Sequence, residues 1–568
     1  MATTATDHER PWLNHYPPGI QWDVPIDTTP IHEQVLRACA KLPDADALDF
    51  LGKKTKFRDL ERQINAFAGA LQKKLGVKKG TRVAMLLPNT PFYVIAYYAI
   101  LKIGGIVVNC NPLYTPGELR HIVGNSGAEL MITLDLKQIF DKAEKLVAEG
   151  HVKHLVVCNF PEALPGPKKL LYKLAKSSDL AKVSASPIAD KISDFDTLIG
   201  LKLASTPVPI DAHTDCAVQQ YTGGTTGVPK GAMLSHANVA AQVSQINYWG
   251  LQVFHPPSRV IAVLPFFHIF AMTTCMNLPL AGGVQVIMLP RFELRALLDT
   301  LTRTGANVLL AVPTLIQALA KHGDKAAPQL QSLEVVVSGG APLSDEVRAN
   351  WSKVSKSLLA EGYGLTEASP VVCCAALAVP SKPLSIGQPL PGTDVRFVDV
   401  ETNEVVALGE RGELQVKGPQ VMLGYYNAPE ATTGAFMEGW LRTGDVGYFD
   451  EDGYVFLVDR IKDLIICSGF NVYPRIIEEA LMHHPAVEET NVIGVPDEYR
   501  GEAPVAYVKL RPGQGVTETE LKDFLGEHLN RIEMPKEILF KDELPKTLIG
   551  KLSKKELRTE YAAQRSPR

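Results

Sequence analysis

The chain has 568 residues, more than one hydrophobic core usually serves, so its length predicts more than one domain. Apolar residues make up 46% and charged residues 21% of it, which is typical of globular proteins. A net charge of -4 gives no electrostatic reason to bind nucleic acid, so the expected partners are a small molecule or a protein.

Residues 1–30 mix charged residues with prolines and have no apolar core of the kind a secretory signal needs. We expect this segment to be an extended arm. The eight cysteines show no C-x-x-C spacing. They are therefore expected to be reduced core residues of a cytoplasmic protein, and not disulfides or zinc ligands.

Strand-like and helix-like runs alternate over the first four hundred residues. An expected helix at 90–101 stands among expected strands at 82–87, 105–108, 130–133, 154–158, 307–312 and 333–338. Apolar strands joined by helical crossovers predict a mostly parallel, helix-covered sheet. Beyond Ile386 the segments become short and are separated by Gly and Pro turns, as at 412–417 and 453–458, which indicates a β-rich subdomain.

The charged run 459–463 precedes about a hundred residues with elements of their own, so we place a domain boundary there. In this last part helices are expected at 474–483 and 518–530, and strands at 487–495 and 503–510.

A lysine-rich segment, 167–182, carries leucines at helical spacing beside its lysines. Such a basic amphipathic helix can lie on an anionic membrane surface, and the alternative is a solvated helix packed on the main domain. Residues 260–290 contain no charged side chain, but Pro265, Pro279 and the pair Gly282-Gly283 argue against a membrane-spanning helix. We expect buried core there, with a strand at 284–289 and a wall for an apolar ligand.

Residues 221–231, Tyr-Thr-Gly-Gly-Thr-Thr-Gly-Val-Pro-Lys-Gly, predict a phosphate-binding loop. Glycines let backbone N–H groups converge on an oxyanion, and the threonines and Lys230 add donors and charge. A Walker loop is excluded, because Lys230 is followed by a glycine and a short strand, and a helix starts only at Ser235.

Four further clusters carry candidate site residues. The turn 338–342 follows a buried strand, where a flat base can lie against the backbone. Tyr363-Gly-Leu-Thr-Glu367 offers a stacking ring and a carboxylate for Mg²⁺. Asp445, between glycines, suits two ribose hydroxyls, with a self-stabilised turn as the alternative. Lys551 follows Gly550 near the end of the chain.

Taken together, these stretches resemble the adenylate-forming superfamily of acyl-CoA synthetases, aryl-CoA ligases, luciferases and peptide-synthetase adenylation domains. The surroundings of the motifs and the segment 165–176 resemble the bacterial long-chain fatty acyl-CoA synthetases among them. The resemblance implies an α/β fold with a large N-terminal domain (1–459, its β-rich part 386–459), a hinge (460–463) and a small mobile α+β C-terminal domain (464–568).

The resemblance also implies the reaction. A carboxylate attacks the α-phosphorus of ATP, and a thiol then displaces AMP from the acyl adenylate. Lys551 would bridge the carboxylate and the α-phosphate, and Glu367 and Thr226 would hold Mg²⁺. The implied ATP-binding residues are Thr222, Gly223, Gly224, Thr225, Thr226, Gly227, Lys230, Gly339, Gly340, Ala341, Tyr363, Gly364, Thr366, Asp445 and Arg460. Lys462 is the implied hinge, and Gly469 would face the pantetheine arm of coenzyme A.

The acid is expected to be a long-chain fatty acid. Residues 265–270 read Pro-Phe-Phe-His-Ile-Phe, and no acidic residue follows until Glu293 to pair with the ammonium of an amino acid. His268 could gate the tail or position the carboxylate, or it could simply be a core histidine. The alternatives are a medium-chain or aromatic acid:CoA ligase, or an acyl-AMP ligase that loads a carrier protein. A homodimer and a peripheral position on the inner face of a membrane are further expectations.

Overall fold

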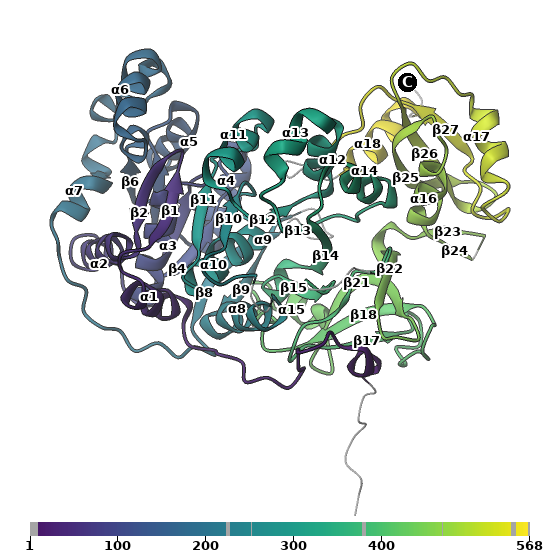
Figure 1. Cartoon of the computed structure of the whole chain (residues 1–568), viewed down its shortest axis with the longest axis horizontal. Helices are drawn as coiled ribbons and strands as arrows, with labels where there is room; N and C mark the ends of the chain where they lie inside the picture. The colour runs from purple at the N-terminus through teal and green to yellow at the C-terminus, as the bar shows by residue number, and fades with distance from the viewer. Residues whose placement is uncertain are drawn as a thin grey trace, which may run out of the picture.

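The computed structural model describes residues 10–222, 228–250, 253–377, 382–468, 470–546 and 552–565, without the side chains of Asp324 and Lys325. Two large sheets with their helices form the N-terminal part, a β-rich part follows, and a smaller C-terminal part lies beside α12 and α14 (Figure 1). The predicted α/β fold class is confirmed.

An eight-stranded sheet contains the first of the strands that were predicted to alternate with helices. Apolar residues occupy both faces of its inner strands; β5, for example, is buried at every position. The strand order is β19 (Gly424–Tyr425), β9 (Lys230–Ser235), β8 (Cys216–Thr222), β4 (Ile106–Asn109), β3 (Arg82–Leu86), β5 (Leu130–Leu134), β6 (His154–Cys158) and β7 (Ile192–Asp194). The strands from β8 to β7 run parallel, as expected for helical crossovers.

A nine-stranded sheet contains the later strands of this predicted alternation. Its six strands from β1 to β14 run parallel to one another. Its order is β16 (Gln388–Pro389), β15 (Val371–Cys374), β14 (Leu358–Gly364), β13 (Val335–Gly339), β12 (Val308–Ala311), β10 (Arg259–Ala262), β11 (Gln285–Met288), β1 (Asp46–Phe50) and β2 (Lys53–Lys56). The strands predicted at 284–289, 307–312 and 333–338 are therefore present as β11, β12 and β13.

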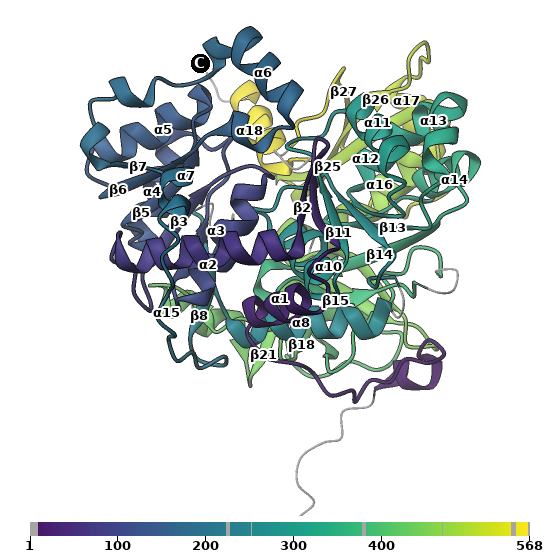
Figure 2. The ribbon, with the colours of Figure 1, turned by 60° about the vertical axis from the view of Figure 1, so that its left-hand side comes forward.

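Helices cover these sheets (Figures 1 and 2). The predicted helix at 90–101 is α3, which begins after Thr90, whose hydroxyl accepts the backbone N–H of Tyr93. The N-terminal helices are α1 (Ile31–Lys41), α2 (Phe57–Lys73), α3 (Pro91–Lys102), α4 (Pro116–Ser126), α5 (Lys137–Ala148), α6 (Gly166–Ala175), α7 (Phe195–Gly200) and α8 (His236–Gly250). They are followed by α9 (Ile269–Ala271), α10 (Leu278–Ala281), α11 (Leu294–Thr304), α12 (Pro313–Lys321), α13 (Gly323–Leu330) and α14 (Asp345–Val354).

The β-rich part is an antiparallel sheet of β17 (Asp394–Val398), β18 (Gly412–Lys417), β21 (Trp440–Phe449), β20 (Phe436–Met437) and β22 (Val455–Arg460), with α15 (Pro429–Ala435) beside it. The C-terminal sheet contains β24 (Phe470–Val472), β23 (Ile465–Cys467), β26 (Gly501–Leu510), β25 (Val487–Asp497) and β27 (Glu537–Phe540). Its helices are α16 (Pro474–Met482), α17 (Glu518–Leu525) and α18 (Lys554–Arg565). The helix predicted at 518–530 is too long, because α17 ends at Leu525.

Residues 10–30 form an arm that is packed against the protein, which the expectation of an extended arm did not include. A short helical turn, Pro11–His15, places the fully buried Trp12 against Phe449, with ring centroids 5.5 Å apart. Arg10 pairs with Asp394 at 2.6 Å. In both views the arm runs beneath the β-rich part to α1 (Figures 1 and 2). We call residues 10–30 the N-terminal arm.

The uncharged stretch 260–290 lies in the core, as β10, α9, a π-helical turn (Met272–Asn277), α10 and β11. Across the described ranges, no helix has the length and apolarity needed to cross a membrane. All eight cysteines are free thiols, and all but Cys216 are buried, which confirms the prediction of reduced core residues.

Two buried histidines, His32 on α1 and His236 at the start of α8, lie 5.9 Å apart between ring centroids. Burial, the neighbouring ring and Lys102 lower the pKa of His32 to about 3. Burial and Lys79 lower the pKa of His236 to about 4, although Asp215 opposes this. Neither ring nitrogen of His236 has a hydrogen-bond partner among the described residues.

This pair predicts acid sensitivity. Because both folded-state pKa values lie below the unfolded value near 6.5, the unfolded chain takes up protons first as the pH falls. Stability should be full above pH 6.5 and fall toward pH 4 by on the order of 1 kcal/mol per pH unit for each histidine. Thermal unfolding from pH 7.5 to 5 measures this. His32→Leu should flatten the pH dependence, and an identical slope in the variant would contradict the assignment.

Candidate functional site

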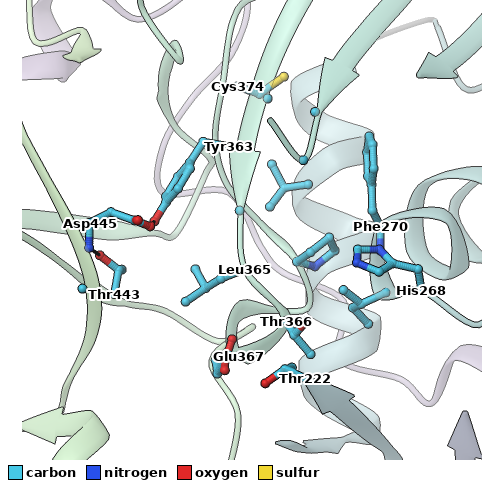
Figure 3. A pocket seen from close by; sticks show the side chains of 18 of the residues that line it. Thr222, His268, Phe270, Tyr363, Leu365, Thr366, Glu367, Cys374, Thr443 and Asp445 are labelled. Atoms are coloured by element: carbon cyan, nitrogen blue, oxygen red, sulfur yellow. Dashed lines mark hydrogen bonds between the residues drawn. The ribbon is translucent and has the colours of Figure 1, made fainter. Parts of the chain in front are cut away.

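A cavity of about 870 Å³ lies where the ends of β8, β13 and β14 meet the middle of β21. These strands belong to all three sheets of the first 460 residues. Of the residues predicted from sequence, the following line it: Thr222, Lys230, His268, Gly339, Gly340, Tyr363, Gly364, Thr366, Glu367, Asp445, Arg460 and Lys462. Stretches far apart in the chain are thus brought to one place, as Figure 3 shows for the labelled residues.

Asp445 is the centre of a polar cluster on one wall. Its carboxylate accepts the Tyr363 hydroxyl at 2.5 Å and pairs with Arg460 at 2.8 Å. Asp445 and Arg460 are paired across β21 and β22, so the register of the sheet places them together. The side chain of Asp445 is only 6% exposed, and it therefore presents a fixed acceptor to the cavity.

Glu367 lies on another wall, close to Thr222 (Figure 3). The Tyr425 hydroxyl donates to its Oε1 at 2.7 Å, and the Lys230 ammonium lies 5.6 Å from the centre of the Tyr425 ring. Thr222 and Lys230 pair across the β8–β9 hairpin and so frame the predicted phosphate-binding loop. A carboxylate beside a lysine and a threonine is a donor set suited to phosphates and a divalent cation.

The glycines at the ends of β13 and β14 keep this part of the cavity open. A side-chain carbon on Gly339 would lie 3.0 Å from the Phe270 ring, and one on Gly364 would overlap the Pro370 carbonyl. Gly340 has a positive φ of 79°, a conformation that glycine adopts without strain. Ala341, also predicted, does not line the cavity.

His268 stands on the cavity wall next to Phe270 (Figure 3). Its Nδ1 accepts the Phe270 backbone N–H at 3.3 Å, and burial lowers its pKa to about 4. The ring is therefore neutral at pH 7. A neutral imidazole fixed through Nδ1 can present Nε2–H as a donor.

The other end of the cavity is apolar. Its wall comes from the C-terminal half of α8 (Ile246 and Trp249), from Phe254 beyond that helix, and from β15 and residues that follow it, namely Val371, Cys374, Leu377 and Leu390. From the uncharged stretch 260–290 only His268, Ile269, Phe270 and Thr274 reach this cavity. The expectation that this stretch forms a ligand wall holds here for its helical middle, and further residues of the stretch line a second cavity, namely Val263, Leu264, Pro265, Phe267, Ala271 and Pro290.

A second cavity, of about 1330 Å³, shares His268, Phe270 and Gly340 with the first. Four lysines and one arginine line it, namely Lys137 and Lys142 on α5, and Lys176, Arg291 and Lys546 from other parts of the chain. Among its apolar lining residues are Phe160, Leu264 and Leu315. It therefore combines a cationic part and an apolar part, and it borders the first cavity.

Several predicted residues fall outside the described ranges. They are Gly223, Gly224, Thr225, Thr226, Gly227, Gly469 and Lys551. Lys546 and Leu552, on either side of the segment with Lys551, form a β-bridge, and Lys546 lines the second cavity.

Sequence reasoning did not single out Glu413, Arg442 and Tyr425. Glu413 pairs with Arg442 at 2.8 Å and accepts the Gly444 backbone N–H at 3.1 Å, and it thereby holds the turn before Asp445. Tyr425 holds the Glu367 carboxylate in place through its hydroxyl. The polar residues of β18 alternate with apolar ones, so Glu413 carries no local signal of this role.

Residues 35–426 match the family described as AMP-binding enzyme, and residues 476–551 match the family described as AMP-binding enzyme C-terminal domain. The chain belongs to the AMP-binding enzyme family. This AMP-binding enzyme is 40% identical to a long-chain-fatty-acid–CoA ligase of Bacillus subtilis, over 97% of the chain and 98% of the relative. It is 32% identical to 4-coumarate–CoA ligase 2 of Oryza sativa, over 94% of the chain and 93% of the relative.

Solved structures of other proteins share this fold. ATP-bound MatB from Rhodopseudomonas palustris has a TM-score of 0.82 at 28% identity, covering 95% of this AMP-binding enzyme and all of MatB. The anthranilate CoA ligase AuaEII in complex with anthranoyl-AMP has a TM-score of 0.81 at 25% identity, covering 95% and 99%. Apo MatB has a TM-score of 0.73 at 28% identity.

Proposed function

We propose that the chain is a long-chain-fatty-acid:CoA ligase that forms AMP. The observation that carries this proposal is the first cavity, where a polar end with Asp445, Glu367 and Lys230 continues into an apolar end with Trp249 and Phe254. Such a cavity accepts a nucleotide and an apolar acid side by side. The fatty acid, ATP and CoA are the substrates, with Mg²⁺ as cofactor.

At the polar end the chain orients ATP. Asp445 accepts hydrogen bonds from both ribose hydroxyls, and its ion pair with Arg460 holds the carboxylate in place. The adenine lies along Gly339 and Gly340, beside the Tyr363 ring. Lys230 and the loop 223–227 bind the β- and γ-phosphates. Glu367 would hold Mg²⁺, with Thr226 as a further ligand, and a cation bound there would neutralise phosphate charge.

In the first step a fatty-acid carboxylate oxygen attacks the α-phosphorus, the bond to the β-phosphate breaks, and pyrophosphate leaves. Lys551 bridges the two anions, and His268 donates from Nε2 to the carboxylate. In the second step the sulfur of CoA attacks the acyl carbon, the acyl–phosphate bond breaks, and AMP leaves. Enclosure of the reacting groups in the cavity strengthens each of these electrostatic contacts.

The second cavity suits CoA. Its lysines and Arg291 face a ligand that carries several phosphates, while its apolar part and the shared residue His268 give a thiol arm a route to the acyl adenylate. Lys142 is held in place, since its ammonium donates to the carbonyls of Pro112 and Tyr114 at 2.9 Å.

The C-terminal part, 464–568, acts as a lid that turns about the hinge 460–463 between the steps. In the arrangement seen, Arg511, which follows β26, pairs with Glu346 on α14 at 2.7 Å, and Lys321 on α12 pairs with Glu488 on β25. Ile466 on β23 and Phe470 on the antiparallel neighbour β24 are 55% and 59% exposed. Exposed apolar side chains there support a second position in which the hairpin packs against the cavity.

AMP release with ATP, Mg²⁺ and a ladder of acids from C4 to C18 plus coumarate, with and without CoA, tests the proposal. We expect the highest kcat/KM for long-chain acids and turnover only with CoA. A profile that peaks at coumarate or at medium-chain acids would show the corresponding ligase instead. Release of pyrophosphate and of the acyl adenylate without CoA, at the rate of the reaction with CoA, would indicate an acyl-AMP ligase.

The helix α6 supports peripheral binding to an anionic membrane. It projects at the outer edge of the N-terminal part (Figure 1), and Leu170, Leu171 and Leu174 are 63%, 65% and 73% exposed. None of its residues is buried. Tyr172 packs on Phe160 and holds the helix to the protein. Glu162 pairs with two of the helix lysines and neutralises part of their charge. The exposed leucines therefore contribute to membrane binding beside the remaining charge.

Replacing Lys168, Lys169, Lys173 and Lys176 by glutamate should lower sedimentation with anionic phosphatidylserine vesicles at least tenfold, because each cation near such a surface contributes about 1 kcal/mol. Leu170→Gln with Leu174→Gln should weaken binding on anionic and neutral vesicles alike. Unchanged sedimentation of both variants would remove the membrane assignment and leave a solvated helix.

A further inference from the structure

The apolar end of the first cavity is closed in part by an indole. Trp249, at the end of α8, lines the cavity, is 1% exposed, and donates from Nε1 to the Ala375 carbonyl at 3.1 Å. This single hydrogen bond fixes one edge of a large ring. The position of the rest of the ring depends on what packs behind it.

The residue behind it belongs to the N-terminal arm. The Tyr16 ring meets the Trp249 ring edge to face, with centroids 5.3 Å apart. Tyr16 does not line the cavity, so the indole stands between the cavity and the arm. The Tyr16 hydroxyl donates to the Pro389 carbonyl at 2.7 Å, next to Leu390, which is another cavity-lining residue.

Several contacts fix the N-terminal arm behind the cavity wall that contains Trp249. Trp12 is fully buried, and the Gln388 side chain donates to the His15 carbonyl at 3.1 Å. Farther along, Trp22 Nε1 donates to the Thr393 carbonyl at 3.0 Å. The Asp27 backbone N–H donates to the Ser244 hydroxyl on α8, 3.0 Å away. The arm therefore joins the β-rich part to the helix that carries Trp249.

We infer that the N-terminal arm sets the acyl chain length that the enzyme accepts, with Tyr16 as a positioning residue that fixes Trp249 in the wall of the acyl pocket. This inference rests on the proposed function. Removing the Tyr16 ring leaves a void into which the indole can move, and the pocket deepens. Each additional methylene buried is worth about 0.8 kcal/mol, or about fourfold in kcat/KM.

The test compares kcat/KM for AMP release over acids from C8 to C20, as the ratio of the longest acid to the acid preferred by the unmodified enzyme. Tyr16→Ala should raise this ratio at least about fourfold, and Trp249→Ala should raise it as much or more. The double variant should show no increase beyond Trp249→Ala, because Tyr16 acts only through the indole. Tyr16→Phe, which keeps the ring, should keep the ratio.

Arg10→Gln is the matched control, since it weakens the arm at Asp394, away from Trp249. A purely structural role of the arm would lower kcat/KM equally for every acid. If Tyr16→Ala does not fold, Tyr16→Leu takes its place, and the same rise in the ratio of kcat/KM values is expected. An unchanged ratio in the Tyr16 variant or in Trp249→Ala, or additive shifts in the double variant, would overturn the inference. Absence of AMP release by the unmodified enzyme with every acid would instead overturn the proposed function.

Discussion

Lys551→Ala is expected to slow formation of the acyl adenylate by roughly 10²-fold or more, the usual cost of removing one charge partner from a transition state. Only the first step brings two anions together, so thioester formation from supplied acyl-AMP should change little. Pyrophosphate exchange measures the first step, and thioester formation from acyl-AMP and CoA measures the second.

Lys546→Ala is the matched control, because Lys546 is a neighbouring lysine that pairs with Glu489 at 2.6 Å on the C-terminal sheet and lines the second cavity. Its loss should leave pyrophosphate exchange nearly unchanged. Equal losses of both steps in Lys551→Ala would show that this lysine serves folding or lid position, and would end its assignment to the first step.

Asp445→Ala is expected to raise the KM for ATP by on the order of 10²-fold. The carboxylate is the acceptor proposed for two ribose hydroxyls, and hydrogen bonds to a charged group are worth about 1.5–3 kcal/mol each. Its loss also leaves the Tyr363 hydroxyl and Arg460 without their shared partner. Because the Arg460 side chain is 42% exposed, water compensates part of that loss, and the effect on stability should be the smaller one.

ATP titrations of the initial rate measure this effect, and Tyr363→Phe is the control. That variant removes the hydroxyl that binds Asp445 but keeps the ring beside the adenine, so the KM for ATP should rise only a few-fold. An Asp445→Ala enzyme with an unaltered KM for ATP would mean that Asp445 merely stabilises its own turn, which is the alternative that the sequence left open.

Much of the fold could be predicted because buried parallel strands are apolar on both faces and stand out as short runs. The strands at 82–86, 130–134 and 154–158 are examples. The helix after residue 517 was predicted too long, since its apolar pattern continues after the backbone has left the helix at Gly526. Local pattern does not record where a helix loses its packing partner.

The sequence also indicated most of the polar site, because glycine-rich turns with a single charged residue are conspicuous. It did not indicate that Asp445 and Arg460 pair, which depends on the register between β21 and β22. Tyr425 and Glu413 were not found, because a tyrosine and a glutamate in ordinary strands carry no local signal of what they support.

By itself, the sequence determined the family and the residues proposed for the chemistry, since phosphates and ribose demand particular side chains in short turns. Only the tertiary structure decided how the acid is enclosed. The acyl wall is built from α8, residues after β15 and, behind Trp249, the N-terminal arm, which are hundreds of residues apart. An apolar side chain looks the same in sequence whether it fills the core or lines a cavity, and only packing separates the two.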